Sequence, residues 1–165
     1  MRRTSRPRPD EERLAAWEAL LESHALLVEI LGRELQGETG LSLHDYDVLL
    51  TLYRAPDRRL RMTELAQAVV LSKSGLTRLV DRLEAGGLVR RAACPTDRRS
   101  VFASLTPRGR ATLRRAAPVH LRGIEEHFGR HLPPGEARTL ARSLGRVSAA
   151  LRSREEGPTE ATAGP

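Results

Sequence analysis

The 165-residue chain carries 28 Lys and Arg against 21 Asp and Glu, so its formal net charge is +7 and its pI is near 11.0. That balance favours a polyanionic partner, either nucleic acid or an acidic membrane surface. One cysteine, Cys94, excludes an intramolecular disulfide, and no apolar run approaches the roughly 18 residues of a membrane span. The Arg-rich start lacks the apolar segment of a signal peptide, so we expect a cytoplasmic protein.

The two ends of the chain predict tails, and the first of them leads into a long helix. Residues 1–9 form a basic tail and residues 154–165 an acidic one, both rich in disorder-promoting residues. Residues 10–36 predict a helix of which a single stripe is apolar. The stripe follows alternating steps of three and four and consists of Leu14, Trp17, Leu21, His24, Val28, Leu31 and Leu35. One helix cannot bury this stripe alone, so it needs a long helical partner.

The middle of the chain, residues 41–106, predicts a winged helix-turn-helix. Ser42 and Asp45 resemble a capping box at the start of its first helix. Residues 59–61 predict a short strand, and Thr63 is the expected cap of the next helix. Further along, residues 88–93 and 100–105 predict the two strands of a β hairpin.

The most informative stretch is residues 63–83, which predicts two short helices joined by a tight turn. Ser72 caps the second helix, residues 73–85, and Gly86-Gly87 stops it. The back of that helix is apolar, and its front carries hydroxyl and guanidinium groups, which hydrogen-bond to phosphates and base edges. The back consists of Leu76, Leu79, Val80 and Leu83, and the front of Ser74, Thr77, Arg78 and Arg82.

Each polar residue of this helix has an expected role on DNA. Ser72, Lys73 and Ser74 cluster at its N-terminus, where the helix dipole suits an approaching phosphate. Arg78 is the candidate for a bidentate contact to guanine, and Thr77, like Ser74, is expected at a base or a phosphate. Arg82 is expected at a phosphate. Asp81 is expected to pair with a neighbouring Arg, because a free carboxylate would be repelled by DNA.

The turn of the hairpin adds a second group of basic residues. Arg98 and Arg99 are placed to enter or straddle a minor groove, and Asp97 is placed to hold one of them. Any one of these arginines alone is equally well explained as a surface charge. The ordered combination of capped helix, Gly-Gly stop and Asp-Arg-Arg hairpin indicates a DNA-binding surface.

The C-terminal part predicts two more helices. Thr106 is the expected N-cap and Pro107 the first residue of a helix running to about His131, with Pro118 kinking it or ending its first half. A last helix runs to about Ser153. We expect residues 10–36 and 107–153 to form a helical dimerisation region rather than an intramolecular bundle, because a palindromic DNA site requires two-fold symmetry.

These segments together resemble the MarR family of winged helix-turn-helix transcriptional regulators. The resemblance rests on LSLHDYDVLLTL at 41–52, RMTELAQAVVLSKSGLTRLVDRLEAGGLVRR at 61–91 and CPTDRRSVFASLTPRGR at 94–110, and it covers about residues 12–152. It implies a mainly α fold with a small antiparallel β wing, and a homodimer on a palindromic double-stranded DNA operator. It places Ser74, Thr77, Arg78 and Arg82 in the major groove, and the wing arginine at the minor groove.

The resemblance also implies a repressor that releases DNA when it binds a small effector, often phenolic or anionic. The effector pocket of such proteins lies between the dimer helices and the DNA-binding lobe. Trp17, His24, Tyr46 and Asp47 are candidates to line it, although a Trp and a His in such a stripe are more often core or interface residues. Cys94 lies beside the wing turn and is interpreted as a small turn residue.

Three alternatives come from other classes of protein. The chain lacks GxGxxG, HExxH, CxxC, GxSxG and Walker A motifs, so we expect no enzyme and no cofactor. A metal-responsive regulator could use His120, His127 and His131, the last two at i and i+4 of one expected helix. A winged-helix protein-interaction module is the third alternative, but such a module need not keep a basic front on the helix 73–85.

Overall fold

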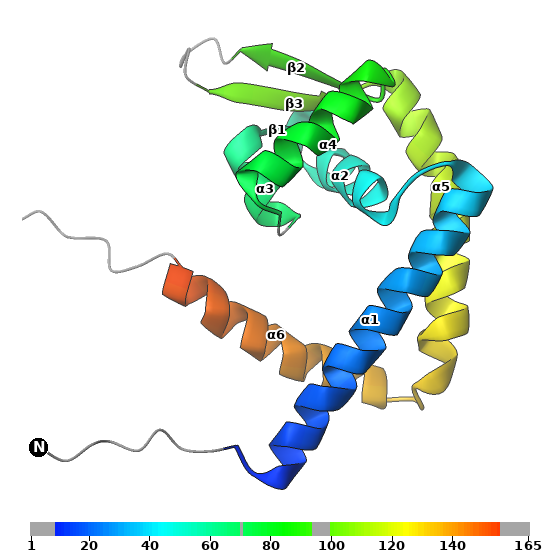
Figure 1. Ribbon diagram of the computed structural model, residues 1–165, viewed down its shortest axis with the longest axis vertical. Coiled ribbons are helices and arrows are strands. Elements are labelled where there is room, and N and C mark those ends of the chain that lie inside the picture. Colours follow the sequence, from blue (N-terminus) through cyan, green and yellow to red (C-terminus); the bar gives the residue numbers. More distant parts are fainter. Residues whose placement is uncertain (1–8, 70, 94–99, 156–165) are drawn as a thin grey trace, which may run out of the picture. The chain divides into compact units, whose positions relative to one another are not determined.

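The computed structural model describes residues 9–69, 71–93 and 100–155 (Figure 1). Both expected tails fall largely outside these residues, and so does the wing turn with Cys94, Asp97, Arg98 and Arg99. The chain forms two compact units, Met1–Ile124 and Glu125–Pro165. No described helix is both long enough and apolar enough to cross a membrane.

The described residues are mostly helical, with one small sheet, as the sequence predicts. The first unit contains α1 (Glu11–Thr39), α2 (Leu43–Arg54), a 3-10 turn η1 (Pro56–Arg58), β1 (Arg59–Arg61), α3 (Met62–Ala68), α4 (Lys73–Ala85), β2 (Val89–Ala93), β3 (Val101–Leu105) and most of α5 (Pro107–His127). The second unit contains the end of α5, a 3-10 turn η2 (Gly129–His131) and α6 (Glu136–Glu155).

Helix α1 contacts the core only near its C-terminal end. Its N-cap, Asp10, accepts a hydrogen bond from the backbone N–H of Arg13 at 2.8 Å, and its C-cap, Gly40, takes the left-handed conformation with φ 73°. Leu35 is completely buried. Trp17 and Leu21, which belong to the predicted apolar stripe, are 55% and 49% exposed. Most of the stripe therefore lies open along this helix.

The capping box predicted at the start of α2 is confirmed. The Ser42 hydroxyl accepts from the backbone N–H of Asp45 at 3.1 Å, and the Asp45 carboxylate accepts from the backbone N–H of Ser42 at 3.0 Å. These bonds satisfy two donors that the first turn of a helix otherwise leaves unpaired. The α2 face that follows, including Val48, Leu49 and Leu52, is fully buried and forms the centre of the core.

The predicted cap of α3 is wrong. Helix α3 begins at Met62, one residue before Thr63, and its N-cap is Arg61. The Glu64 carboxylate accepts a hydrogen bond from the backbone N–H of Arg61 at 2.9 Å. Because this carboxylate reaches back from the third helical position, the helix start is stabilised without a capping hydroxyl.

The sheet has the strand order β1-β3-β2, with both pairs antiparallel. Strand β1 has the predicted bounds, and in it Arg59 pairs with Ser104 and Leu60 with Ala103. Strands β2 and β3 each begin one residue later than predicted. The buried side chains of Val89 and Ala103 face the core that the helices complete.

The start of α5 is confirmed, and of the two outcomes predicted at Pro118, a kink or an end, the second is wrong. The Thr106 hydroxyl accepts from the backbone N–H of Gly109 at 2.9 Å, with Pro107 at the first helical position. The helix continues through Pro118 and does not end there. An internal proline costs about 3 kcal/mol or more. Burial of Leu113 and Ala116 beside it holds this part of the helix on the core.

The end of α5 also differs from the prediction. The helix stops at His127 rather than near His131, because Phe128 leaves the helical conformation with φ −132° and ψ −57°. His131 lies in the 3-10 turn η2. His127 and His131 are therefore not on one continuous α-helical face.

Ser72 caps α4 as predicted, which leads to a direct test of stability. Its hydroxyl accepts from the backbone N–H of Gly75 at 3.1 Å. Ser72→Ala removes this acceptor and is expected to lower the free energy of unfolding by about 1 kcal/mol in urea denaturation. Ser72→Asp keeps an acceptor and serves as the matched control. Equal stability of the alanine and aspartate variants would contradict the capping role.

Candidate nucleic-acid interface

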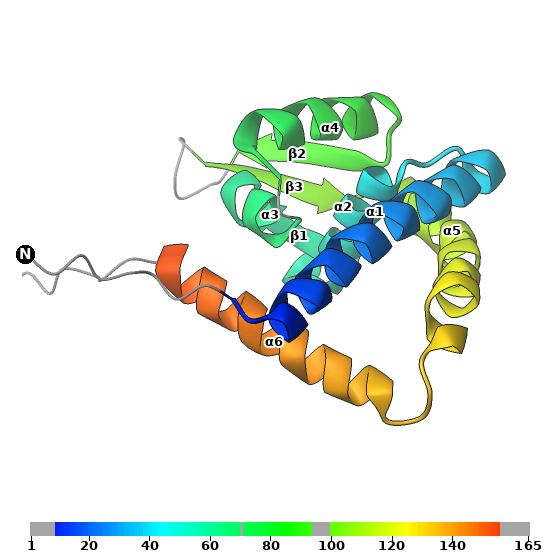
Figure 2. The same ribbon diagram turned by 60° about the horizontal axis from the view of Figure 1, so that its bottom comes forward.

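Helix α4 has the two faces that the sequence predicts. Leu76, Leu79, Val80 and Leu83 are all at most 5% exposed and pack into the core. The side chains of Ser74, Thr77 and Arg78 are exposed on the opposite face. Figure 2 shows α4 alongside β2, with one side of the helix open to solvent. The helix is thus anchored by leucine and valine while its polar front stays accessible.

The N-terminus of α4 gathers hydroxyl groups. The Ser72 and Ser74 hydroxyl oxygens lie 3.3 Å apart, both exposed. Lys73 is the first residue of the helix, and the positive end of the helix dipole favours a phosphate here. No acidic residue occupies the first turn of this helix, so nothing on that turn opposes an anion.

Arg78 is free to contact a ligand. Its side chain is exposed, and within the described residues it takes part in no ion pair or hydrogen bond. A guanidinium without an internal partner keeps all five donors available in the fork geometry that guanine accepts. The contact to guanine expected of Arg78 stays a prediction.

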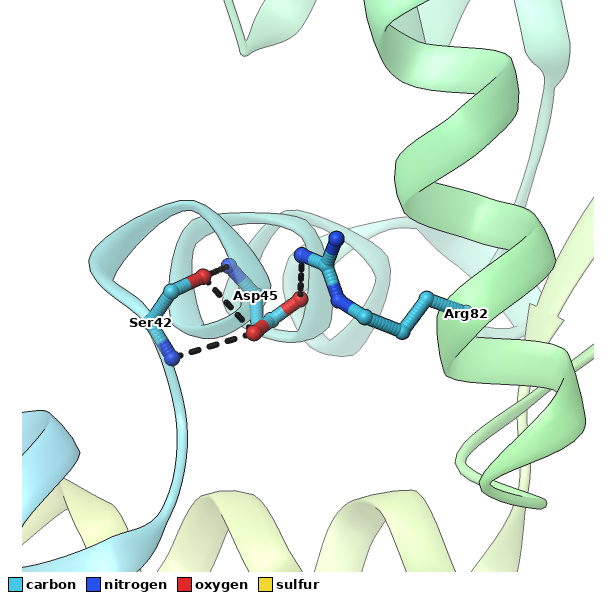
Figure 3. Close-up of polar contacts among 3 residues, drawn as sticks. All are labelled: Ser42, Asp45 and Arg82. Atoms are coloured by element: carbon cyan, nitrogen blue, oxygen red, sulfur yellow. Dashed lines mark hydrogen bonds and ion pairs between the residues drawn. The ribbon is translucent and has the colours of Figure 1, made fainter.

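Arg82 has an internal partner that the sequence analysis did not anticipate. Its Nη2 lies 2.7 Å from Oδ1 of Asp45 on α2, and the Asp45 side chain is only 9% exposed (Figure 3). The sequence predicted Asp45 only as part of the capping box at the start of α2. Its second partner comes from a residue 37 positions later in the chain, which no local pattern reveals.

The sequence analysis missed Arg91, which fixes α4 against the wing. Its Nη1 lies 2.6 Å from the carboxylate of Asp81, and its Nη2 donates to the carbonyl of Thr77 at 3.1 Å. Its backbone N–H donates to Glu84 at 2.7 Å. The expected pairing of Asp81 with an arginine is confirmed, although the arginine comes from strand β2. The spacing of Asp81 and Glu84 on one helical face was the available signal.

A cavity of about 330 Å³ lies between the start of α3, helix α4 and strands β2 and β3. Two guanidinium groups and several hydroxyls border it. Its lining residues are Arg61, Met62, Thr63, Thr77, Arg91, Ser100 and Val101. The cavity therefore adjoins the residues that connect α4 to the wing.

The residues predicted to line an effector pocket fall into two groups. Tyr46 is buried, Asp47 is half-buried, and both lie on α2. Trp17 and His24 lie exposed on α1, about 27 Å and 16 Å along the helix from Leu35, where α1 meets the core. Their part in a common pocket stays a prediction.

His120 on α5 joins the first of these groups, a contact that the sequence analysis did not foresee. Its ring centroid lies 4.5 Å from that of Tyr46, with the rings tilted by 50°. Its Nδ1 is buried and has no hydrogen-bond partner within the residues that the structure describes. Burial lowers the pKa of His120. Burial also raises the pKa of Asp47, and the nearby His120 and His44 act against that rise.

The lowered pKa of His120 predicts a loss of stability in mild acid. As the pH falls below the usual value of 6.5, the unfolded chain takes up a proton that the folded state resists, so the free energy of unfolding should decrease. His120→Gln should remove this dependence when denaturation is measured from roughly pH 7 to 5.5. Asp47 contributes to the pH dependence of stability in the opposite direction, because its pKa in the folded state is raised above the usual 3.8. That contribution changes at lower pH than the effect of His120. If the free energy of unfolding fell equally with pH in the wild type and in the His120→Gln variant, the dependence would not come from His120.

The three-histidine metal site is not assembled. Within the described ranges, no group of three or more His, Cys, Asp or Glu side chains could hold a metal ion. The physical reason is that α5 ends at His127, while His131 lies in the 3-10 turn and His120 lies against Tyr46.

Comparison with known proteins identifies the family. The MarR family model matches residues 39–100. The solved structure of AbsC, a MarR family transcriptional regulator from Streptomyces coelicolor, is 36% identical, and the match covers 90% of this chain and 99% of that one with a TM-score of 0.81. The chain belongs to the MarR family. It is a transcriptional regulator, as the sequence predicted, and its relatives are not enzymes.

Two further MarR-type proteins extend the comparison. Sco3205 of Streptomyces coelicolor, solved in complex with DNA, is 37% identical, and the match covers 87% of this chain and 94% of that one with a TM-score of 0.81. The repressor YetL of Bacillus subtilis (strain 168) is 36% identical over 85 residues, which is 52% of this chain and 51% of YetL. The chain thus spans only about half the length of such curated relatives.

Proposed function

We propose that this MarR family regulator is a homodimer that represses transcription by binding a palindromic double-stranded DNA operator. The observation that carries the proposal is the front of α4, where Arg78 is exposed and unpaired among the described residues, next to Ser74 and Thr77. A protein-interaction module need not keep such a front on α4. The solved DNA complex of Sco3205 and the similarity to the repressor YetL support the same proposal.

Helix α4 and the wing would contact different grooves of the DNA. Arg78 with Ser74 and Thr77 would read base edges in the major groove, while Ser72 and Lys73 at the helix start would hold a phosphate. Arg98 and Arg99 would reach the minor groove, with Asp97 holding one of them. Arg91, tied to Asp81 and to the Thr77 carbonyl, would hold the wing strand and α4 together.

Dimerisation follows from the apolar stripe of α1. Leu14, Trp17 and Leu21 are each between 45% and 55% exposed. Burying such side chains contributes about 1.5–3 kcal/mol each, so a stripe of this length favours a second helix. On α6, Val147 and Leu151 are also 55% exposed. A second copy of the chain would cover these surfaces and place two α4 helices on successive turns of one duplex.

A small effector is the proposed signal for release of DNA. Tyr46, Asp47 and His120 offer an aromatic ring, a carboxyl group and an imidazole at the junction of α2 and α5, a setting suited to a phenolic or anionic molecule. Trp17 and His24 would contribute from α1 if the dimer brings α1 close to this junction. A titration of phenolic acids against the DNA complex would identify the active class.

Salt dependence tests the DNA-binding proposal directly. A palindromic duplex selected from a random pool should bind with an affinity that falls steeply as salt rises, because several phosphates release their counterions. Random duplexes should bind at least 1000-fold more weakly, the order expected of a specific regulator. Equal binding of selected and random duplexes, with no effect of salt, would refute the proposal.

A further inference from the structure

Asp45 is a carboxylate buried at the start of α2. It is only 6% exposed, and within the described part of the chain it is the only charged residue classed as buried. One carboxylate oxygen accepts from the Ser42 backbone N–H at 3.0 Å and from the Ser42 hydroxyl at 2.7 Å. The other accepts from Nη2 of Arg82 at 2.7 Å (Figure 3). A buried charge persists only when it is paired and hydrogen-bonded, and Arg82 supplies the opposite charge.

Arg82 differs in this respect from Arg78, which lies one helical turn earlier. Arg78 has no ion pair with any described residue, whereas the charge of Arg82 is balanced by Asp45. The Arg82 side chain is still 61% exposed. A neutralised pair attracts a phosphate much less than a free guanidinium does, so it releases few counterions on binding.

We propose that Arg82 is a positioning residue, which fixes helix α4 to the first turn of α2 through Asp45 instead of contacting a DNA phosphate. This inference rests on the proposed function to the extent that α4 is the DNA-reading helix. It replaces the phosphate contact that the sequence analysis expected for Arg82. In this role the arginine sets the angle at which Arg78 meets the groove.

The same contacts connect α4 to the end of α1. Ser42 follows directly after Leu41, which is 6% exposed, and the backbone N–H of Leu41 donates to the Thr39 hydroxyl at 3.2 Å. The Thr39 hydroxyl in turn donates to the carbonyl of Leu35, the buried anchor of α1, at 2.6 Å. Hydrogen bonds and the chain itself therefore link the end of α1 through Ser42 and Asp45 to Arg82.

A double-mutant cycle tests the pairing on DNA. Asp45→Asn keeps the shape of the side chain and an oxygen for Ser42 but removes the charge, and Arg82→Met removes the guanidinium. Each is expected to weaken binding of the selected palindromic duplex about tenfold, and the double variant about tenfold rather than a hundredfold, because both remove one interaction. The slope of log affinity against log salt should stay within about half a unit of wild type in all three variants.

A phosphate contact would give the opposite pattern. Arg82→Met would then reduce the salt slope by about two, one for each protomer of the dimer, and Asp45→Asn would leave the affinity unchanged or increase it by releasing Arg82. Either of these results on the cycle would overturn the proposal. Arg78→Met is the matched control, since it removes the same charge from a residue that has no partner among the described residues.

Hydrogen exchange of the protein without DNA separates this proposal from the proposed function. Asp45→Asn and Arg82→Met should speed amide exchange in residues 79–85 and in the first turn of α2 by about tenfold or more, while Arg78→Met should not. Unchanged exchange in the first two variants would overturn the positioning role, whatever the result on DNA. Faster exchange in a protein that binds no duplex specifically would support the positioning role and reject the proposed function.

Discussion

Arg78→Ala is expected to remove sequence preference at one base pair of each operator half-site. A bidentate arginine contact to guanine contributes about 1–3 kcal/mol of discrimination, and a symmetric dimer would lose this amount at both half-sites. The side chain is exposed and has no ion pair or hydrogen bond within the described residues. Its loss should therefore leave the fold intact, so that the whole effect appears in binding.

The measurement is equilibrium binding to duplexes that carry each of the four base pairs at every operator position. Wild type should reject three of the four at one position of each half-site, and the variant should bind all four about equally. Arg114→Ala removes the same charge from an exposed position on α5 and should keep the preference. If Arg78→Ala weakened selected and random duplexes by the same factor, the residue would be a phosphate contact instead.

Gly109→Ala is expected to have the largest effect on stability. A Cβ atom at this position would lie 2.1 Å from the carbonyl oxygen of Leu88 and 2.8 Å from Cδ1 of Leu105. The Leu88 carbonyl cannot easily move away, because it accepts hydrogen bonds from both the backbone N–H and the hydroxyl of Thr106. Overpacking against backbone falls at the upper end of the usual range, so we expect a loss of about 3 kcal/mol or more.

Gly37→Ala is the matched control for this substitution. Gly37 lies inside α1, and a Cβ there would meet nothing within 4 Å. Alanine should stabilise this helix by about 0.5–1 kcal/mol, because glycine loses more backbone entropy on folding. Both variants should be compared by urea denaturation at one protein concentration, since dimerisation shifts apparent stability. A Gly109→Ala protein as stable as wild type would show that the start of α5 can move away from β2.

Features held by hydrogen bonds within one helical turn were predictable from the sequence. Ser42 with Asp45, Ser72 and Thr106 all begin helices as expected, because a capping hydroxyl reaches only two or three residues along the chain. The short strand at residues 59–61 and the apolar back of α4 were likewise readable from the local pattern. The cap of α3 was missed because Glu64 performs it from inside the helix.

Tertiary packing decided the features that depend on distant residues. Burial of Leu113 and Ala116 carries α5 through Pro118, where local preference favours a kink or an end. The ion pairs Arg82–Asp45 and Arg91–Asp81 join residues from different helices and strands. Spacing along the sequence does not specify which residues pair in this way. Hence the sequence by itself determined the family, the helix starts and the polar front of α4, which are local properties. Only the folded chain decided which arginines pair with a buried or neighbouring carboxylate and which have no partner among the described residues, because a charge finds its partner through space.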